Sequence, residues 1–158
     1  MLITEVKNKK TASEFLDVAR EIYRNDPHWV CPLDKDVEAV FDPEKNGLHK
    51  HGVCTRWVLK SDDGQLIGRI AAFVNEKKAY QPEQPTGGIG FFECINDPEA
   101  AKLLFITAEK WLAEKGMKAM DGPINFGEND SFWGLLIEGF TTPSYGMNYH
   151  HPYYKSLF

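Results

Sequence analysis

The sequence lacks the features that mark several large classes of protein. It has 3 cysteines in 158 residues, an odd number at wide spacing, which favours reduced structural thiols over a disulfide framework. No apolar run approaches the roughly 18 residues of a membrane-spanning helix. No block of Lys and Arg occurs, and the net charge is -5, which argues against nucleic acid as a partner. We therefore expect neither nucleic acid nor a membrane to be the partner.

What the chain does contain is enough apolar material for one folded domain. A hydrophobic content of 42% and an aromatic content of 13% exclude a disordered chain. The length suits a single domain over residues 1–158, with a core that needs neither disulfides nor a metal. The first residues have too short an apolar run and no small-residue cleavage site for a secretory signal, so a cytoplasmic location is expected.

The first part of the chain predicts a strand and two helices. Residues 2–6 have strand character. Thr11 and Glu14 form a capping-box pattern, which predicts a helix starting at Thr11. Apolar residues at helical spacing indicate a second, short helix over residues 32–41.

A hairpin follows. Residues 55–60 and 65–75 have strand character on either side of a polar turn. The second of these segments is nearly all apolar apart from Arg69, which predicts a strand in the middle of the sheet, covered on both faces. Residues 76–88 are polar and predict an exposed connection, and the glycines and prolines of 84–90 indicate turn chemistry.

The remaining elements predict a parallel crossover. A strand is expected over residues 89–95, and Asp97 and Pro98 are favoured residues for the start of the long helix that follows. Residues 118–122 predict the next strand. A strand, a helix and a strand in this order imply that the two strands are parallel.

Residues 122–143 are crowded with glycines, amides and aromatics that have no helical or strand period. A loop of this length is uncommon unless it is functional or disordered, and this one is too aromatic for disorder. The loop therefore predicts a binding surface, although a long connection that covers the core would have the same composition. Its candidate ligand contacts, which suit a small polar or cationic ligand, are Asn129, Asp130, Ser131 and Trp133. An Asx turn beside a buried Trp133 is the alternative.

The order of these elements resembles the GNAT acyltransferase fold. Five segments are also similar to those of a group of bacterial GNAT-like proteins: GRIAAFVN at 68–75, GFFE at 90–93, DGPIN at 121–125, GLLIEGF at 134–140 and MNYHHPYY at 147–154. The resemblance implies an α/β (α+β) fold with a mixed central sheet flanked by helices. It also implies acyl transfer from acyl-CoA, as co-substrate, to a small amine or amino-acid-like acceptor.

Members of this group continue past the tyrosine-containing helix into further strands. The resemblance therefore implies that residues 1–158 are the first part of a longer protein, or that a partner such as a second copy completes the sheet edge.

The resemblance also suggests which residues act. Glu93, near the end of the predicted fourth strand, is the candidate general base, and a solvent-facing carboxylate at a strand end is the alternative. Tyr153 or Tyr154 corresponds to the general acid, with Tyr154 preferred, and aromatic packing on the sheet is the alternative. Asn125 is placed to hold a ligand amide or to cap the following turn. With Tyr154 as the general acid, Tyr153 is expected to contact the ligand.

One expected feature of GNAT enzymes is missing. They usually hold the CoA pyrophosphate with a glycine-rich loop between the fourth strand and the long helix, where residues 94–99 here read CINDPE. Pro98 removes one backbone N–H donor, and Asp97 and Glu99 add negative charge. The alternative function is therefore a non-catalytic domain that binds a small ligand or an interaction partner. The residues that would bind the cofactor are not identified by the sequence.

No metal site is expected. His49, His51 and Cys54 form an HxHxxC pattern that would hold zinc only if a distant fourth ligand such as His150 or His151 joined it. Structural zinc sites usually have tighter, paired spacing, so exposed loop histidines are the preferred interpretation.

Overall fold

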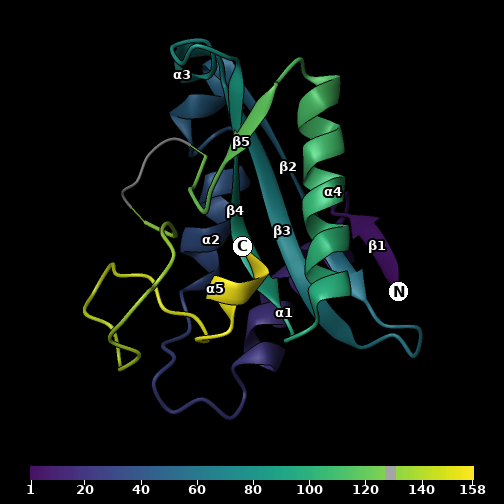
Figure 1. Ribbon diagram of the computed structural model, residues 1–158, viewed down its shortest axis with the longest axis vertical. Helices are drawn as coiled ribbons and strands as arrows, with labels where there is room; N and C mark the ends of the chain where they lie inside the picture. Colours follow the sequence, from purple (N-terminus) through teal and green to yellow (C-terminus); the bar gives the residue numbers. More distant parts are fainter. Residues whose placement is uncertain (127–130) are drawn as a thin grey trace.

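The computed structural model describes residues 1–126 and 131–158, which fold around one five-stranded sheet (Figure 1). The strand order follows the sequence, and all neighbours are antiparallel except the last two, which are parallel. The strands are β1 (Leu2–Glu5), β2 (Gly52–Lys60), β3 (Leu66–Asn75), β4 (Thr86–Cys94) and β5 (Ala119–Asp121). The predicted α/β class with a mixed sheet is confirmed.

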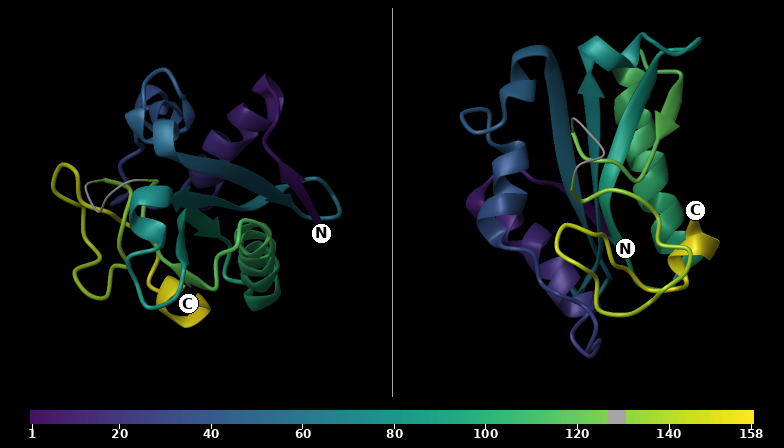
Figure 2. Two further views of the ribbon diagram at one scale, coloured as in Figure 1. Left: turned by 90° about the horizontal axis from the view of Figure 1, so that it is seen from above. Right: turned by 90° about the vertical axis from the view of Figure 1, so that its left-hand side faces the viewer.

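Helices cover both faces of the sheet (Figure 2). Helices α1 (Lys9–Ile22) and α2 (Asp34–Phe41) lie on one face, and α4 (Pro98–Glu114) lies on the other. The short elements are a 3-10 helix (Gly47–His51), α3 (Glu76–Ala79) and α5 (Tyr154–Leu157). None of the helices in the described part of the chain has the length and apolarity to cross a bilayer.

Each face of the sheet has its own apolar core. On the α4 face, Leu104 and Leu112 are buried against sheet residues that include Ile70 and Phe92. On the α1 face the core is aromatic, and its buried members include Phe15, Phe73, Phe91 and Phe126. Strand β3 contributes to both cores because alternate side chains of a strand point to opposite faces. The expected central, doubly covered strand is therefore confirmed.

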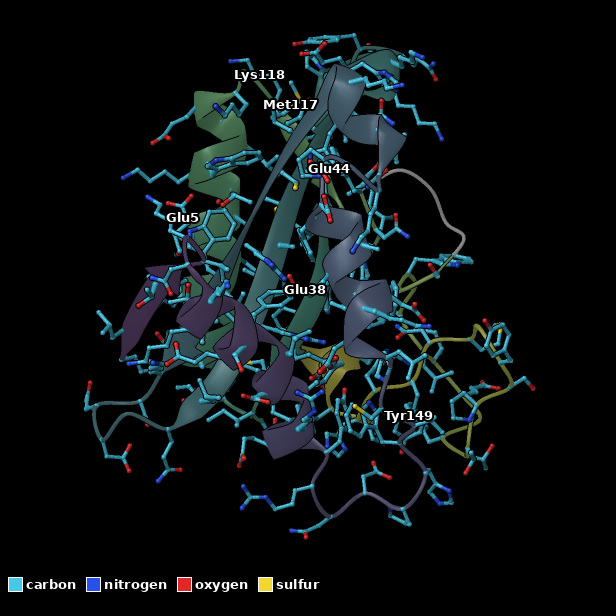
Figure 3. All side chains as sticks on the ribbon, turned by 180° about the vertical axis from the view of Figure 1, so that it is seen from behind. Glu5, Glu38, Glu44, Met117, Lys118 and Tyr149 are labelled. Carbon is cyan, nitrogen blue, oxygen red and sulfur yellow. The ribbon has the colours of Figure 1, made fainter. Side chains whose placement is uncertain are left out.

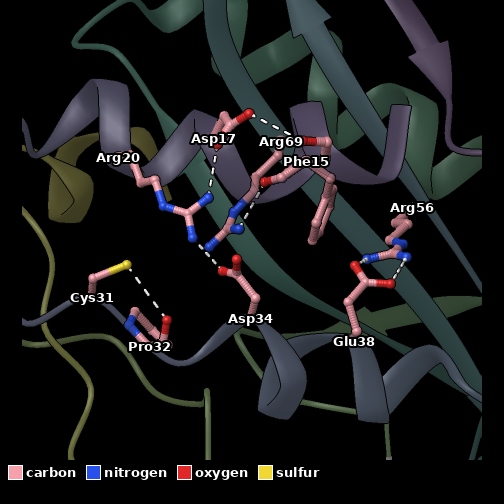
Figure 4. Close-up of polar contacts among 10 residues, drawn as sticks. Phe15, Asp17, Arg20, Cys31, Pro32, Asp34, Glu38, Arg56 and Arg69 are labelled. Carbon is pink, nitrogen blue, oxygen red and sulfur yellow. Dashed lines mark hydrogen bonds and ion pairs between the residues drawn. The ribbon is translucent and has the colours of Figure 1, made fainter. Parts of the chain in front are cut away.

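Helix α2 is attached to the sheet by a partly buried ion pair between Glu38 and a buried arginine (Figure 4). Arg56 of β2 donates to both carboxylate oxygens of Glu38, at 2.7 and 2.9 Å. The Arg56 guanidinium also lies over the rings of Phe15 and Phe41, at 4.9 and 4.1 Å from their centroids. Bidentate geometry and stacking compensate part of the cost of burying this charge.

Strand β4 contains a bulge close to its end. Arg69 of β3 pairs with Glu93, but Ala71 pairs with Gly90, so β4 has one residue more than its partner in this interval. Phe91 takes a left-handed conformation with φ of 50°. A bulge of this kind bends its strand and changes the direction of the next side chains, and bulges are frequent beside functional sites. Glu93 lies immediately after it.

Strand β5 covers only the first part of β4. It pairs with residues 86–88, and the chain then continues along the same edge, where the Ile124 N–H donates to the Ile89 carbonyl at 2.8 Å. This approach needs glycine at position 90, because a Cβ there would lie 1.8 Å from the Ile124 carbonyl oxygen. Beyond this point no strand among the described residues pairs with the end of β4 on this side.

Two local predictions are wrong. Helix α1 begins earlier than predicted, because Asn8 is the N-cap and forms the capping box with Thr11, so that Thr11 is the third helical residue. Strand β4 begins at Thr86, and residues 86–90 therefore belong to the strand and not to a turn. Their glycines allow close approach of the neighbouring chain, a requirement that local sequence does not reveal.

Candidate functional site

A cavity of about 930 Å³ opens where the end of β4 meets three connecting segments. The three connecting segments are the chain after α1, the chain after α2 and the loop that precedes α5, and α2 and β4 supply the rest of the walls. In Figure 2, the loop that precedes α5 and the chain after α1 lie toward the same end of the molecule. The volume lies in the range of about 300–1,000 Å³ that is usual for small-molecule sites. Glu93, Asn125, Ser131 and Tyr154 all line it.

Glu93 is the centre of a largely buried polar network beside this cavity. Its Oε2 atom accepts hydrogen bonds from the hydroxyls of Tyr23 and Tyr154, both at 2.6 Å. Its Oε1 atom lies 3.5 Å from Nη2 of Arg69. Only 13% of the Glu93 side chain is exposed. The carboxylate is therefore not the solvent-facing group of the alternative interpretation.

The two tyrosines act as hydrogen-bond donors because they stay protonated. Burial, and then the negative charge of Glu93, raise the pKa of Tyr23 and of Tyr154 well above the usual 10.0. Both side chains are about 1% exposed. A neutral phenol donates its only proton, and here that proton points to the carboxylate.

The two consecutive tyrosines also satisfy the free edge of β4. The Cys94 N–H donates to the Tyr154 hydroxyl at 3.0 Å, and the Tyr153 hydroxyl donates to the Cys94 carbonyl at 2.7 Å. Buried backbone groups at a strand end need such partners when no strand supplies them. Tyr153 does not line the cavity. Its predicted role as a ligand contact stays a prediction.

The loop residues that the sequence singled out lie in different places. Asn125 is buried and its side-chain amide donates to the Ser131 carbonyl at 2.7 Å, so it holds the loop together at the cavity wall. Trp133 is 39% exposed and does not line the cavity. Asn129 and Asp130 lie outside the described residues. The described residues of the loop form no helix or strand before α5.

Comparison with solved structures identifies the fold. AAC(6')-Iy, in complex with the bisubstrate analogue CoA-S-monomethyl-acetylneamine, aligns with 78% of this chain and 79% of its own at a TM-score of 0.52 and 14% identity. A tandem GNAT protein from the clavulanic acid biosynthesis pathway, without AcCoA, aligns with 73% of this chain and 34% of its own, at a TM-score of 0.53 and 16% identity. The chain has the GNAT fold.

Two curated bacterial proteins are related to this GNAT-fold chain in sequence. Protein YghO of Escherichia coli K12 is 32% identical over 156 residues, which is 98% of this chain. The bacterial ceramide synthase of Caulobacter vibrioides is 28% identical over 153 residues, or 96% of this chain. The match spans 39% of the length of each relative. No protein-family model matches the chain.

The turn between β4 and α4 is where this chain departs from the GNAT pattern expected from sequence. The Asp97 carboxylate accepts the Glu99 N–H at 2.9 Å and thereby caps α4, while Pro98 has no N–H to offer. Two of the first donors of the helix are thus unavailable to an anion, and the cap adds a negative charge. This geometry does not resemble a phosphate cradle.

The remaining candidate groups have structural contacts. His49 contacts the Val40 carbonyl through Nε2, at 3.2 Å, and packs on Phe126. Among the described residues, no three metal-ligating side chains converge. Burial raises the pKa of the Cys54 thiol to about 11 and that of Cys94 to about 12, so neither is suited to act as a nucleophile.

Sequence reasoning missed two members of the Glu93 network. Tyr23 ends the apolar face of α1 and is indistinguishable in pattern from a core residue. Arg69 was visible as the single charge in a buried strand, a signal that a buried partner exists, but the pattern does not say which residue that partner is.

His150, in the GNAT-like MNYHHPYY segment, connects the loop before α5 to the site. It is 4% exposed, stacks on the Tyr154 ring at 4.8 Å, and accepts the Leu136 N–H through Nε2 at 2.6 Å. Its Nδ1 lies 3.0 Å from the His151 carbonyl and so carries the proton. Only the neutral ring with this tautomer makes both bonds.

We expect His150 to make folding stability depend on pH. Burial lowers the pKa of His150 from its ordinary 6.5, so the unfolded chain takes up this proton at a higher pH than the folded chain. The stabilisation is complete above about pH 6.5 and is lost progressively below it. In His150→Gln, the amide oxygen can still accept the Leu136 N–H. Between about pH 7.5 and about pH 5.5, the free energy of unfolding, measured in urea, should therefore fall less in this variant than in wild type. His51→Gln is the control, and equal pH dependence in His150→Gln and wild type would contradict the prediction.

Proposed function

We propose that this chain is the acyltransferase domain of an enzyme that moves an acyl group from acyl-CoA to an amine. The observation that supports it best is the placement of Glu93 after the β4 bulge, in the wall of the cavity, with a tyrosine hydroxyl on its carboxylate. A base for the ammonium and an acid for the departing thiolate are what this reaction requires. The GNAT fold is consistent with that chemistry, although fold alone does not imply function.

The network gives the proton transfers an order. Glu93 takes a proton from the ammonium of the acceptor, and the free amine attacks the thioester carbonyl. The negative charge of Glu93 is one of the causes that raise the pKa of Tyr154. Protonation of Glu93 removes that charge, so Tyr154 becomes a better donor when the C–S bond breaks and the thiolate takes its proton. The nitrogen of the tetrahedral intermediate loses its second proton to water as the C–S bond breaks. Glu93 then returns its proton to Tyr154, which leaves the amide, free CoA, one proton in solvent and both side chains in their original protonation states.

A long-chain amine is our more specific proposal for the acceptor. One relative is named a ceramide synthase, and a ceramide is the N-acyl derivative of a long-chain amino alcohol. The cavity mouth also exposes large apolar side chains, among them Val30, Leu33 and Met147, each more than half exposed. Such a rim suits an alkyl chain better than a small polar amine.

Release of free thiol from acyl-CoA tests the function. Donors from acetyl-CoA to long-chain acyl-CoA are combined with amino acids, a polyamine and a long-chain amino alcohol. We expect thiol release that depends on an amine and is fastest with the amino alcohol. Faster turnover of a short polar amine would overturn the acceptor proposal, and no amine-dependent release with any pair would overturn the transferase itself.

The competing proposal is a domain that binds a ligand without catalysis, and it rests on the capped start of α4.

If the CoA phosphates do approach this helix, Asp97→Asn should strengthen CoA binding about threefold to tenfold, because asparagine keeps the cap and removes a repelling charge. Acyl-pantetheine, which lacks the phosphates of CoA, is the control and should bind both proteins equally. Unchanged CoA affinity by calorimetry would place the phosphates elsewhere.

A further inference from the structure

We infer that Tyr23 is a positioning residue for Glu93: its hydroxyl bond fixes the orientation of the carboxylate. This inference deepens the proposed function and rests on it for the catalytic consequence alone. Tyr23 is the C-cap of α1 and Tyr154 is the first residue of α5, and the two hydroxyls donate to the same oxygen. The carboxylate is thus held between two helices that are far apart in sequence.

The two oxygens of Glu93 have different environments. Oε2 accepts two short bonds from phenols, and the two phenol oxygens lie 3.4 Å from each other. Within residues 1–126 and 131–158, the one polar contact of Oε1 is that of 3.5 Å with Nη2 of Arg69. Hydrogen bonds to a carboxylate favour its charged form, and two on one oxygen leave the other with capacity to accept a proton. Oε1 is therefore the oxygen that this geometry leaves for the acceptor ammonium.

Arg69 cannot fix Glu93 by itself. Its Nη1 donates to the Phe15 carbonyl at 2.9 Å and its guanidinium lies 4.8 Å from the centre of the Phe15 ring. The side chain is buried, and its Nε finds no acceptor among the described residues. The guanidinium thus supplies charge at the long limit of a hydrogen bond, and the short, directional contacts come from the tyrosines.

Tyr23 is itself held by stacking. Its ring lies parallel to Trp29 at 5.0 Å and to His151 at 4.7 Å, with interplanar angles of 16° and 27°. His151 belongs to the segment before α5. Two residues earlier, Tyr149 donates to Asp26 at 2.7 Å, where that segment meets the chain after α1 (Figure 3). The hydroxyl of Tyr23 therefore has little freedom to leave Glu93.

The experiment measures the titration of Glu93 directly. Carboxyl carbons of glutamate are labelled with ¹³C, the Glu93 signal is assigned with Glu93→Gln, and its midpoint is followed by NMR in Tyr23→Phe and in Tyr154→Phe. Phenylalanine keeps the ring and removes only the donor. We expect each substitution to move the Glu93 midpoint to higher pH than in wild type, because the charged carboxylate loses one of its donors. The titratable and charged groups around Glu93 are otherwise unchanged: Arg69, Cys94, His150 and Tyr153.

Thr55→Val is the matched control. Its hydroxyl also donates to a carboxylate, that of Glu5, at 3.0 Å, but near the other edge of the sheet. The Glu93 midpoint should not move in this variant. A midpoint in Tyr23→Phe equal to that of wild type, with the tyrosine at 154 intact, would overturn the inference.

Kinetics separates this inference from the proposed function. In Tyr23→Phe the acid limb of the pH dependence of kcat should move to higher pH with the NMR midpoint, while KM for acyl-CoA stays the same. A shifted midpoint in a protein that releases no thiol as wild type would support the positioning role of Tyr23 and overturn acyl transfer. An acid limb that stays in place while the midpoint moves would remove Tyr23 from catalysis.

Discussion

Replacement of Glu93 by glutamine is expected to lower kcat for amine-dependent thiol release at least about 100-fold. Glutamine has the size of glutamate, and its amide oxygen can still accept the hydroxyls of Tyr23 and Tyr154, but it cannot take up a proton. The acceptor then remains an ammonium, which is not a nucleophile. KM for acyl-CoA should change little, because general-base catalysis contributes to the transition state and not to donor binding.

The control for this substitution is Glu5→Gln. Glu5 also accepts a hydrogen bond from a hydroxyl, that of Thr55, but it lies on the edge strand β1, away from the cavity. The kcat of the Glu5→Gln variant should equal that of wild type. Urea unfolding of Glu93→Gln establishes that the variant is folded. A folded Glu93→Gln protein with wild-type kcat would remove Glu93 from the mechanism, and retained CoA binding without any turnover in wild type would favour the non-catalytic alternative.

The substitution with the largest expected effect on stability is Gly90→Ala. An added Cβ would lie 1.8 Å from the backbone carbonyl oxygen of Ile124, a contact that no rotamer change relieves. The segment after β5 would have to move away from β4, which would weaken the Ile124 N–H bond to Ile89. We expect the free energy of unfolding to fall by about 3 kcal/mol, measured from the urea midpoint.

Gly47→Ala is the matched control, because a Cβ at position 47 meets no atom within 4 Å. Its unfolding free energy should change by no more than about 0.5 kcal/mol. Thiol release should also fall in Gly90→Ala, because Asn125 and the cavity wall follow directly after Ile124. Equal stability of the two variants would show that the approach of the two segments is looser than described.

Patterns within a single element predicted the fold well. The Asp97 and Pro98 start of α4 and the apolar run of β3 each depend on neighbours in sequence, and both are confirmed. Errors occurred where a residue type had two uses. The glycines of 86–90 indicate a turn locally, but they serve close packing against a chain more than thirty residues later.

The candidate site was predicted in part. Glu93 and Tyr154, named from the resemblance, lie within 2.6 Å of each other in the cavity wall, although no observation yet tests their roles. Of the loop residues predicted to contact a ligand, Asn125 and Ser131 line the cavity, whereas Trp133 does not. An exposed indole and a ligand-contacting indole have the same sequence signature, because the direction of a loop side chain depends on backbone turns that composition does not encode.

By itself, the sequence determined the class of fold, the order of its elements and the carboxylate on which the chemistry is proposed to depend. Only the tertiary structure decided that Glu93 lies between Tyr23 and Tyr154, and that Asp97 closes the start of α4 with its own side chain. The reason is physical. Periodicity in the sequence indicates which face of an element is buried. The hydrogen bond between Tyr23 and Glu93 joins residues 70 positions apart, and it forms only because the bulge, the crossover and the loops bring the two side chains together.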